Sequence, residues 1–141
     1  MNIVDSKIIK FIQKHHLLHL ATSSNNKPYA ASCFYLYLED ENTLIFASDI
    51  QSKHIQNALI QAEVAGTIAA ETLFINRIKG VQFKGLLYEV DQGNMRKKYI
   101  KRFPVAFFIP FRLWGVRLHY LKMTDNILGF AKKLIWEGKN R

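Results

Sequence analysis

The sequence predicts a mainly β protein with flanking helices, in which six antiparallel strands close into a barrel. Three observations lead to this fold class. Short runs rich in β-branched and aromatic residues recur along the chain, and each ends in a tight polar turn. The links between the first three runs are too short for a helical crossover, so these strands pair antiparallel. One helix pattern then separates the third run from the fourth, and closing such a sheet removes its exposed edges.

The composition agrees with one domain over residues 1–141. Apolar residues make up 49% of the chain and aromatic residues 13%, which excludes a disordered chain and favours strands over a helical bundle. Cys33 is the single cysteine, so an internal disulfide framework is excluded. No signal-peptide pattern opens the chain, and no apolar run reaches the ~20 residues that a membrane span needs. We therefore expect a cytoplasmic protein.

The elements are predicted in order from periodicity, caps and turn residues. A first helix is expected over residues 5–16, capped by Asp5 or Ser6. A second begins after the N-cap Ser52 and carries the apolar stripe Ile55, Ala58, Leu59 and Ala62. A third covers the basic residues 94–102. Strands are expected over residues 16–22, 29–38, 43–47, 63–70, 78–90 and 114–123. Residues 128–136 form a last short segment, strand or helix.

Two strands carry further signals. Gly80 and Gly85 in the fifth strand predict a bulge, a barrel corner or a close backbone approach. The sixth strand is predicted to alternate strictly along its length. One face would then carry Trp114, Val116, Leu118, Tyr120 and Lys122, and the other Arg117, His119, Leu121 and Met123.

The stretch from Thr43 to Ala62 carries the main functional signal, because a strand, a polar turn and a helix follow one another there. The first turn of a helix offers free backbone N–H groups and the positive end of the helix dipole. Lys53 and His54 lie in that turn, and Ser48 and Ser52 place hydroxyls before it. These groups suit a phosphate. The alternative is an ordinary capped helix whose lysine points into water.

Histidines and charge give weaker signals. His15, His16 and His19 lack a Cys, Asp or Glu that would complete a metal site, so we interpret them as surface and strand residues and predict no metal. Residues 1–93 hold eight Lys and Arg against nine Asp and Glu, a balance of −1, whereas residues 94–141 hold twelve against two, a balance of +10. The C-terminal third therefore suits an anionic partner of unspecified class.

With this order of elements, the chain resembles the pyridoxamine 5′-phosphate oxidase-like FMN-binding split barrels. The resemblance lies in the strands YAASCFYLYL and LIFASD, the helix start Ser52-Lys53-His54 and the strand around GVQFKG, and it extends from about His16 to about Tyr120. The segments IKGVQFKG, KRFPVA and TDNILGFAKKLIW are similar to an uncharacterised bacterial family of small split-barrel proteins, over nearly the whole chain.

The resemblance implies a six-stranded split barrel that forms a homodimer with FMN at the subunit seam. The flavin phosphate would be held by Ser48, Lys53 and His54, with Ser52 beside them. The second-strand positions from Ser32 through Cys33 to Tyr37 would lie beside the isoalloxazine and ribityl groups. Gln82 would reach the flavin edge or remain a solvated glutamine on the barrel face. The family's C-terminal vitamin-binding signature is absent, so vitamin synthesis is not predicted.

The chain departs from the family at its phosphate cations. Ser32 and Tyr37 stand where the family's oxidases have basic residues, and His54 replaces a third. Each charge-assisted contact is worth ~1.5–3 kcal/mol, so weak FMN binding or none is expected unless other cations substitute. The substitutes considered are Lys79, Lys84 and Lys132.

The leading hypothesis is a dimeric FMN-binding oxidoreductase that passes hydride or electrons between a nicotinamide and a small acceptor. The cofactor carries that chemistry, so no catalytic residue is named. Cys33 is interpreted as packing and Trp114 as core or dimer seam. The alternative is a non-enzymatic dimer whose basic C-terminal third binds nucleic acid or a phospho-ligand, although its cations fit no nucleic-acid motif. For the aromatic run 103–111, burial at a dimer seam is favoured over docking on a membrane surface.

Overall fold

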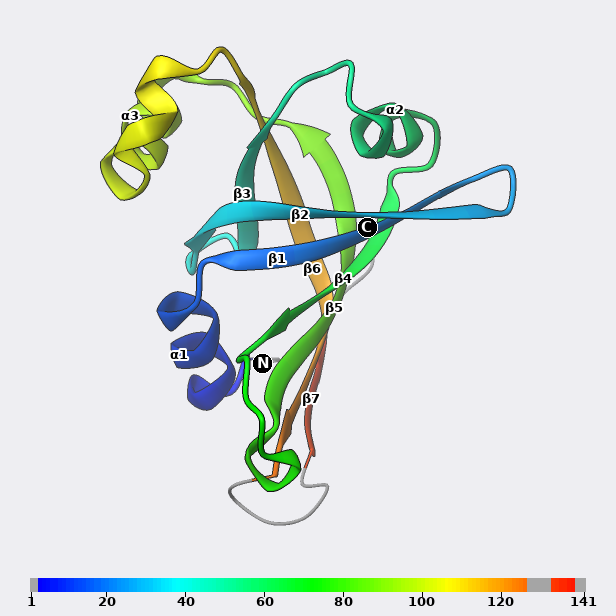
Figure 1. Ribbon diagram of the computed structural model, residues 1–141, viewed down its shortest axis with the longest axis vertical. Helices are drawn as coiled ribbons and strands as arrows, with labels where there is room; N and C mark the ends of the chain where they lie inside the picture. Colours follow the sequence, from blue (N-terminus) through cyan, green and yellow to red (C-terminus); the bar gives the residue numbers. More distant parts are fainter. Residues whose placement is uncertain (1–2, 127–132, 139–141) are drawn as a thin grey trace.

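The computed structural model describes residues 3–126 and 133–138, and within these ranges the strands form one antiparallel sheet flanked by three α-helices (Figure 1). The helices are α1 (Ser6–Lys14), α2 (Lys53–Ile60) and α3 (Gly93–Arg102), with 3-10 helices η1 (Ile75–Arg77) and η2 (Pro104–Phe108). The strands are β1 (Leu17–Ser24), β2 (Lys27–Leu38), β3 (Thr43–Ser48), β4 (Glu63–Ala69), β5 (Lys79–Glu89), β6 (Arg112–Asp125) and β7 (Lys133–Glu137). No helix within the described ranges is long and apolar enough to cross a membrane.

The sheet closes through β6. The strand order is β3-β2-β1-β4-β5-β6-β7, and β3 also pairs with β6. One edge of β6 pairs with β5. The other edge of β6 pairs with β3 over residues 112–117 and with β7 over residues 120–124. The barrel is therefore closed at one end and split at the other. The seventh strand corrects the predicted six: residues 133–137 of the last segment form β7, and residues 128–132 lie outside the described ranges.

A bulge interrupts the pairing of β5 with β6. Lys84 pairs with Tyr120, whereas Gly85 pairs with Leu118, so His119 is an extra residue on β6. The apolar residues that β6 contributes to the barrel core are consequently Trp114, Val116 and Leu118 before the bulge and Leu121 and Met123 after it. Of the three alternatives predicted from Gly80 and Gly85, a bulge is found at Gly85, and the strict alternation predicted for residues 114–123 is wrong beyond Leu118.

Two apolar regions hold these elements together. The larger one fills the barrel around Phe46, Phe83 and Trp114, and side chains of α1 and α2 seal it. The smaller one lies between the outer face of β3 and β6 and a segment that we call the arm, residues 93–111. There Tyr99 packs with Ile45 and Leu113, and the arm is joined to β2 by a hydrogen bond from Tyr99 Oη to the carbonyl oxygen of Phe34 (2.9 Å).

Candidate functional site

Polar side chains gather where β3 ends and α2 begins. Ser48 is the last residue of β3, and its Oγ lies 2.7 Å from His54 Nε2 and 3.1 Å from Ser52 Oγ. Lys53 is exposed beside them in the first turn of α2. We call Ser48, Ser52, Lys53 and His54 the β3–α2 corner. Three of the four side chains predicted to hold a phosphate are thus in mutual contact, and the fourth adjoins them.

The helix start at this corner has no side-chain cap. Ser52 occupies the N-cap position as predicted, but its hydroxyl donates to the carbonyl oxygen of Asp49 (2.6 Å) and accepts no hydrogen bond from an N–H group of the helix. The expectation that this hydroxyl accepts from the helix backbone is therefore wrong. The Asp49 carboxylate accepts from the backbone N–H of Gln51 (2.8 Å), before the helix begins. The first N–H groups of α2 are left to interact with solvent or with an anion.

His54 contributes an uncharged imidazole to the corner near neutral pH. Its ring lies 6.4 Å from that of Phe46, at the end of the barrel interior. Burial disfavours the imidazolium and lowers the pKa of His54 below its ordinary value of 6.5. Its Nε2 contact with Ser48 can be made as donor or acceptor. Lys53 is then the only permanent cation among the four corner residues.

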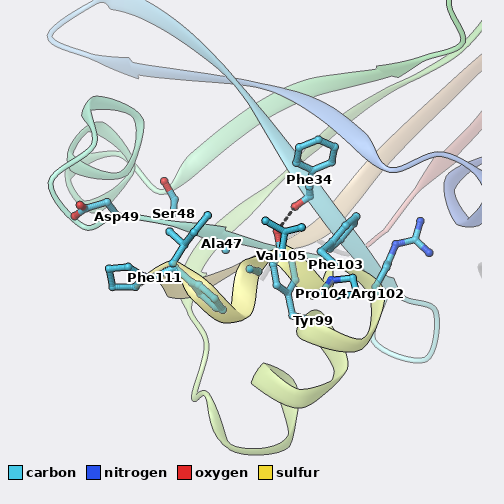
Figure 2. A pocket seen from close by; sticks show the side chains of 13 residues that line it. Phe34, Ala47, Ser48, Asp49, Tyr99, Arg102, Phe103, Pro104, Val105 and Phe111 are labelled. Atoms are coloured by element: carbon cyan, nitrogen blue, oxygen red, sulfur yellow. Dashed lines mark hydrogen bonds between the residues drawn. The ribbon is translucent and has the colours of Figure 1, made fainter.

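An apolar pocket adjoins the corner on the arm side of β3 (Figure 2). Its volume is about 800 Å³, within the ~300–1,000 Å³ usual for small-molecule sites. The strands contribute one side of the pocket and the arm contributes the other. Its lining is mostly aromatic and aliphatic, and Ser48 belongs both to this lining and to the corner. The lining residues are Phe34, Ala47, Ser48, Asp49, Tyr99, Arg102, Phe103, Pro104, Val105, Ala106, Ile109, Pro110 and Phe111.

The predicted residues of β2 lie away from this pocket. Ser32 is exposed, and its Oγ is 2.9 Å from His19 Nδ1. Cys33 is packed inside the barrel, and burial raises the pKa of its thiol to about 11, as suits a packing residue. Tyr37 donates to Asn42 Oδ1 (2.7 Å), and burial raises its pKa to about 12. The β2 residue that lines the pocket is Phe34, which strand alternation places opposite Cys33 but which the sequence reasoning did not single out.

Gln82, Lys79 and Lys84 also lie away from the β3–α2 corner within one chain. Gln82 is exposed on β5, between Thr67 of β4 and Lys122 of β6. It lies seven residue steps (~23 Å) along the strand from Glu89, which pairs with Trp114 near the corner. Lys79 lies farther along β5 and forms an ion pair with Asp125 (3.7 Å). Lys84 lies over the ring of Tyr120, and Lys132 is outside the described residues.

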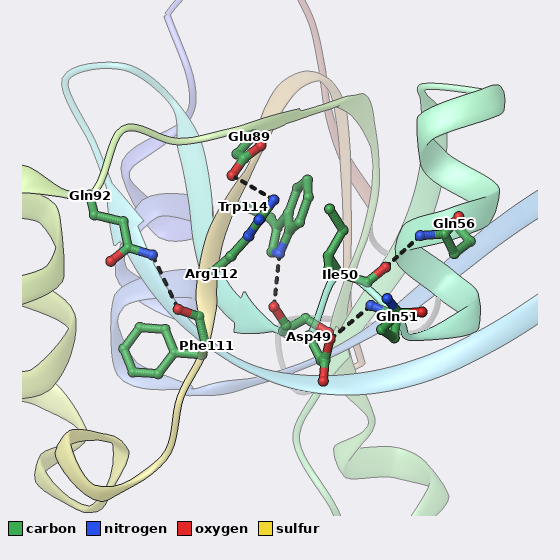
Figure 3. A network of polar contacts seen from close by, with 10 residues as sticks. Asp49, Ile50, Gln51, Gln56, Glu89, Gln92, Phe111, Arg112 and Trp114 are labelled. Carbon is green, nitrogen blue, oxygen red and sulfur yellow. Dashed lines mark hydrogen bonds and ion pairs between the residues drawn. The ribbon is translucent and has the colours of Figure 1, made fainter.

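Trp114 supports the corner from inside the barrel. Its side chain is fully buried, which confirms the core interpretation, and its Nε1 donates to the carbonyl oxygen of Ser48 at 3.0 Å (Figure 3). This bond joins β6 to the end of β3 in addition to the strand pairing. The position of the Ser48 backbone is thus fixed from the core side.

The closed sheet with its flanking helices defines a split-barrel protein. No protein-family model matches the chain. A UPF0306 protein of Photorhabdus laumondii is 35% identical over 133 residues, covering 92% of this chain and 93% of that protein. One from Yersinia pseudotuberculosis is 38% identical over 132 residues, covering 92% and 90%. The chain belongs to the UPF0306 family.

Solved structures confirm the predicted fold. A Listeria innocua protein provisionally described as a pyridoxamine 5′-phosphate oxidase superimposes with a TM-score of 0.70 at 12% identity, covering 84% of this chain and 95% of that one. An FAD-binding protein of Mesorhizobium loti gives 0.69 at 13% identity, with 86% and 92% covered. A heme-binding protein of Mycobacterium smegmatis gives 0.75 at 13% identity, with 98% and 60% covered. At these identities the likeness concerns the fold alone.

Proposed function

We propose that the protein binds FMN at the β3–α2 corner and in the adjoining pocket and acts as a flavin-dependent oxidoreductase. The observation that carries the proposal is the continuity of the two sites through Ser48. A phosphate requires hydroxyls, N–H groups and cations, and an isoalloxazine ring requires apolar and aromatic walls. The corner offers the first set, and the pocket beside it offers the second.

The residues present fit FMN in part. Ser48 and Ser52 supply hydroxyls, Lys53 supplies a charge, and His54 supplies a further hydrogen-bonding group. The cations that the oxidases carry on β2 are replaced here by Ser32, which contacts His19, and by Tyr37, which donates to Asn42. We therefore expect weak binding.

A bound flavin supplies hydride and one-electron chemistry to a small donor or acceptor such as a nicotinamide. This chain's residues bind the phosphate and exclude water from the ring. No acid–base side chain is required of them, and none is assigned.

The proposed assembly is a homodimer with the flavin at the seam. Gln82 is too far along β5 to reach the corner of its own chain, so a role at the flavin edge requires a second copy. The FAD-binding neighbour has the same fold, which supports a flavin over other phosphorylated ligands.

Removing the corner's permanent charge tests the proposal. Lys53→Ala should weaken FMN binding at least about tenfold, since it deletes one charge-assisted contact. Flavin absorbance of the purified protein and quenching of FMN fluorescence measure binding. Lys10→Ala, an exposed lysine on α1, is the matched control and should leave the affinity unchanged. A colourless wild type that does not quench FMN would contradict the flavin assignment.

A second function has its own supporting observation. The arm exposes Lys97, Lys98, Lys101 and Arg102 on α3, followed by exposed Phe107 and Phe108. Cations interleaved with aromatic rings suit single-stranded nucleic acid. Protein that lacks a flavin signal but shows salt-sensitive retention on single-stranded DNA would favour this acidic-partner function.

A further inference from the structure

Arg112 begins β6 directly opposite Ser48 of β3. Residues opposite each other in an antiparallel pair project from the same face of the sheet, with Cβ atoms about 4.5–5.5 Å apart. The next pair on that face, Phe46 and Trp114, is buried inside the barrel, which fixes the alternation. Arg112 and Ser48 therefore project together from the end of the barrel, on the side where the Ser48 hydroxyl meets His54.

The guanidinium group is held by an exchangeable partner. Arg112 Nη1 lies 3.6 Å from Glu89 Oε2, and the two side chains are 49% and 52% exposed (Figure 3). An ion pair exposed to this degree is screened by water and contributes little. The Arg112 side chain can therefore exchange Glu89 for a stronger anion without disturbing the core.

The charge of the corner depends on this arginine. On the strand ends and the turn that carry Ser48, the charged residues are the cations Lys53 and Arg112 and the carboxylates Asp49 and Glu89, while Arg102 lines the pocket from the arm. Without Arg112, this strand side of the site would hold one lysine against two carboxylates, which disfavours a doubly negative ligand. A guanidinium fork binds two phosphate oxygens at once, so it can replace more than one simple cation.

We infer that Arg112 is the main phosphate-binding cation of this site and stands in for the basic residues that β2 lacks. Glu89 is paired with the guanidinium group until a phosphomonoester displaces the Glu89 carboxylate. The inference rests on the proposed function, because it names a further residue of the same site. It also extends to phosphomonoesters in general, since the recognised group is the phosphate.

The experiment compares FMN with riboflavin, which lacks the phosphate. Arg112→Gln should weaken FMN binding about 10- to 100-fold and leave riboflavin binding within about twofold, because one charge-assisted phosphate contact is lost. Glu89→Gln should tighten FMN binding, because it frees the guanidinium. Arg77→Gln, an exposed arginine of η1, is the control and should change neither affinity. Stabilisation of the ligand-free protein by inorganic phosphate, read from its Tm, is a second measurement.

The outcomes separate this inference from the flavin assignment. If wild type binds FMN and Arg112→Gln binds it equally well, the role of Arg112 is refuted and the flavin function stands. If wild type ignores FMN but phosphate raises its Tm, and Arg112→Gln abolishes that rise, the Arg112 site stands and the flavin function fails. If neither FMN nor phosphate affects wild type, both fall. Should Arg112→Gln fail to fold, Glu89→Gln decides: unchanged affinity for FMN and phosphate refutes the inference.

Discussion

His54 couples the stability of the β3–α2 corner to pH. Burial lowers its pKa in the folded protein below the ordinary 6.5, so the unfolded chain binds the proton more readily. The contribution of the neutral imidazole is complete above pH 6.5 and is lost as pH falls from 6.5 through the lower folded-state pKa. We predict that the free energy of unfolding of wild type decreases over that window, and that His54→Gln decreases less. Urea denaturation from pH 8 to pH 5 measures both slopes.

His15 sets the control for this prediction. Burial, followed by the nearby positive charge of Lys14, also lowers the pKa of His15, so part of the slope must remain in His54→Gln. His15→Gln should remove its own part, and the double variant should remove both. A His54→Gln slope equal to that of wild type would show that burial of His54 does not govern stability in this range.

The corner residues could be predicted from the sequence because they are close together in it. Ser48, Ser52 and His54 lie within one strand–turn–helix unit, so cap and turn chemistry brings them together locally. Arg112 and Phe34 reach the same site through strand register, which no short motif records. A single sequence shows which residues form a strand but not which residue of a distant strand lies opposite.

At the scale of elements, the β5–β6 bulge rests on Gly85. A Cβ at this position would lie 2.5 Å from the carbonyl oxygen of Arg117 and 2.6 Å from Val116 Cγ1. We predict that Gly85→Ala lowers the free energy of unfolding by about 1–3 kcal/mol, because backbone and core must shift to admit the methyl group. Urea denaturation measures the loss.

Gly80→Ala on the same strand is the matched control. Its nearest contact would be the carbonyl oxygen of Ile68 at 3.3 Å, which a small displacement relieves, so its effect should be smaller. Equal losses for the two variants would show that the cost comes from β5 in general and not from the bulge.

The turns and helices show where local pattern is sufficient and where tertiary contacts override it. Asn25 and Asn26, between β1 and β2, both have positive φ angles (52° and 61°), as a two-residue type I′ hairpin turn requires. Helix α2 is less regular than its predicted stripe, since Leu59 is 55% exposed and Asn57 is buried. Asn57 donates to Thr22 Oγ1 (3.2 Å), a buried pairing across 35 residues that periodicity cannot indicate.

At the scale of the whole molecule, the split in the barrel follows from β6 being longer than its partners. Its 14 residues extend beyond the six of β3, and β7 takes over the edge that β3 leaves. The sequence predicted the closed barrel from strand count and turn length. It did not decide between strand and helix for β7, because that short segment carries no clear periodicity and its pairing depends on the unsatisfied edge of β6.

The arm presents an apolar surface that a monomer leaves in water. Val105, Phe107, Phe108 and Ile109 are 73%, 63%, 81% and 55% exposed, and contiguous apolar surface of this kind marks an interaction site. If the arm lies at the proposed dimer seam, the double variant Phe107→Ser, Phe108→Ser should be a monomer at a concentration at which wild type is a dimer. Sedimentation velocity measures both. Leu73→Ser, at a side chain 97% exposed beside η1, is the control and should leave the dimer intact. A double variant that remains a dimer would place the arm outside the seam, and a wild type that sediments as a monomer would contradict the proposed dimer. With a monomeric wild type, the proposed flavin site would have to be completed by this chain alone.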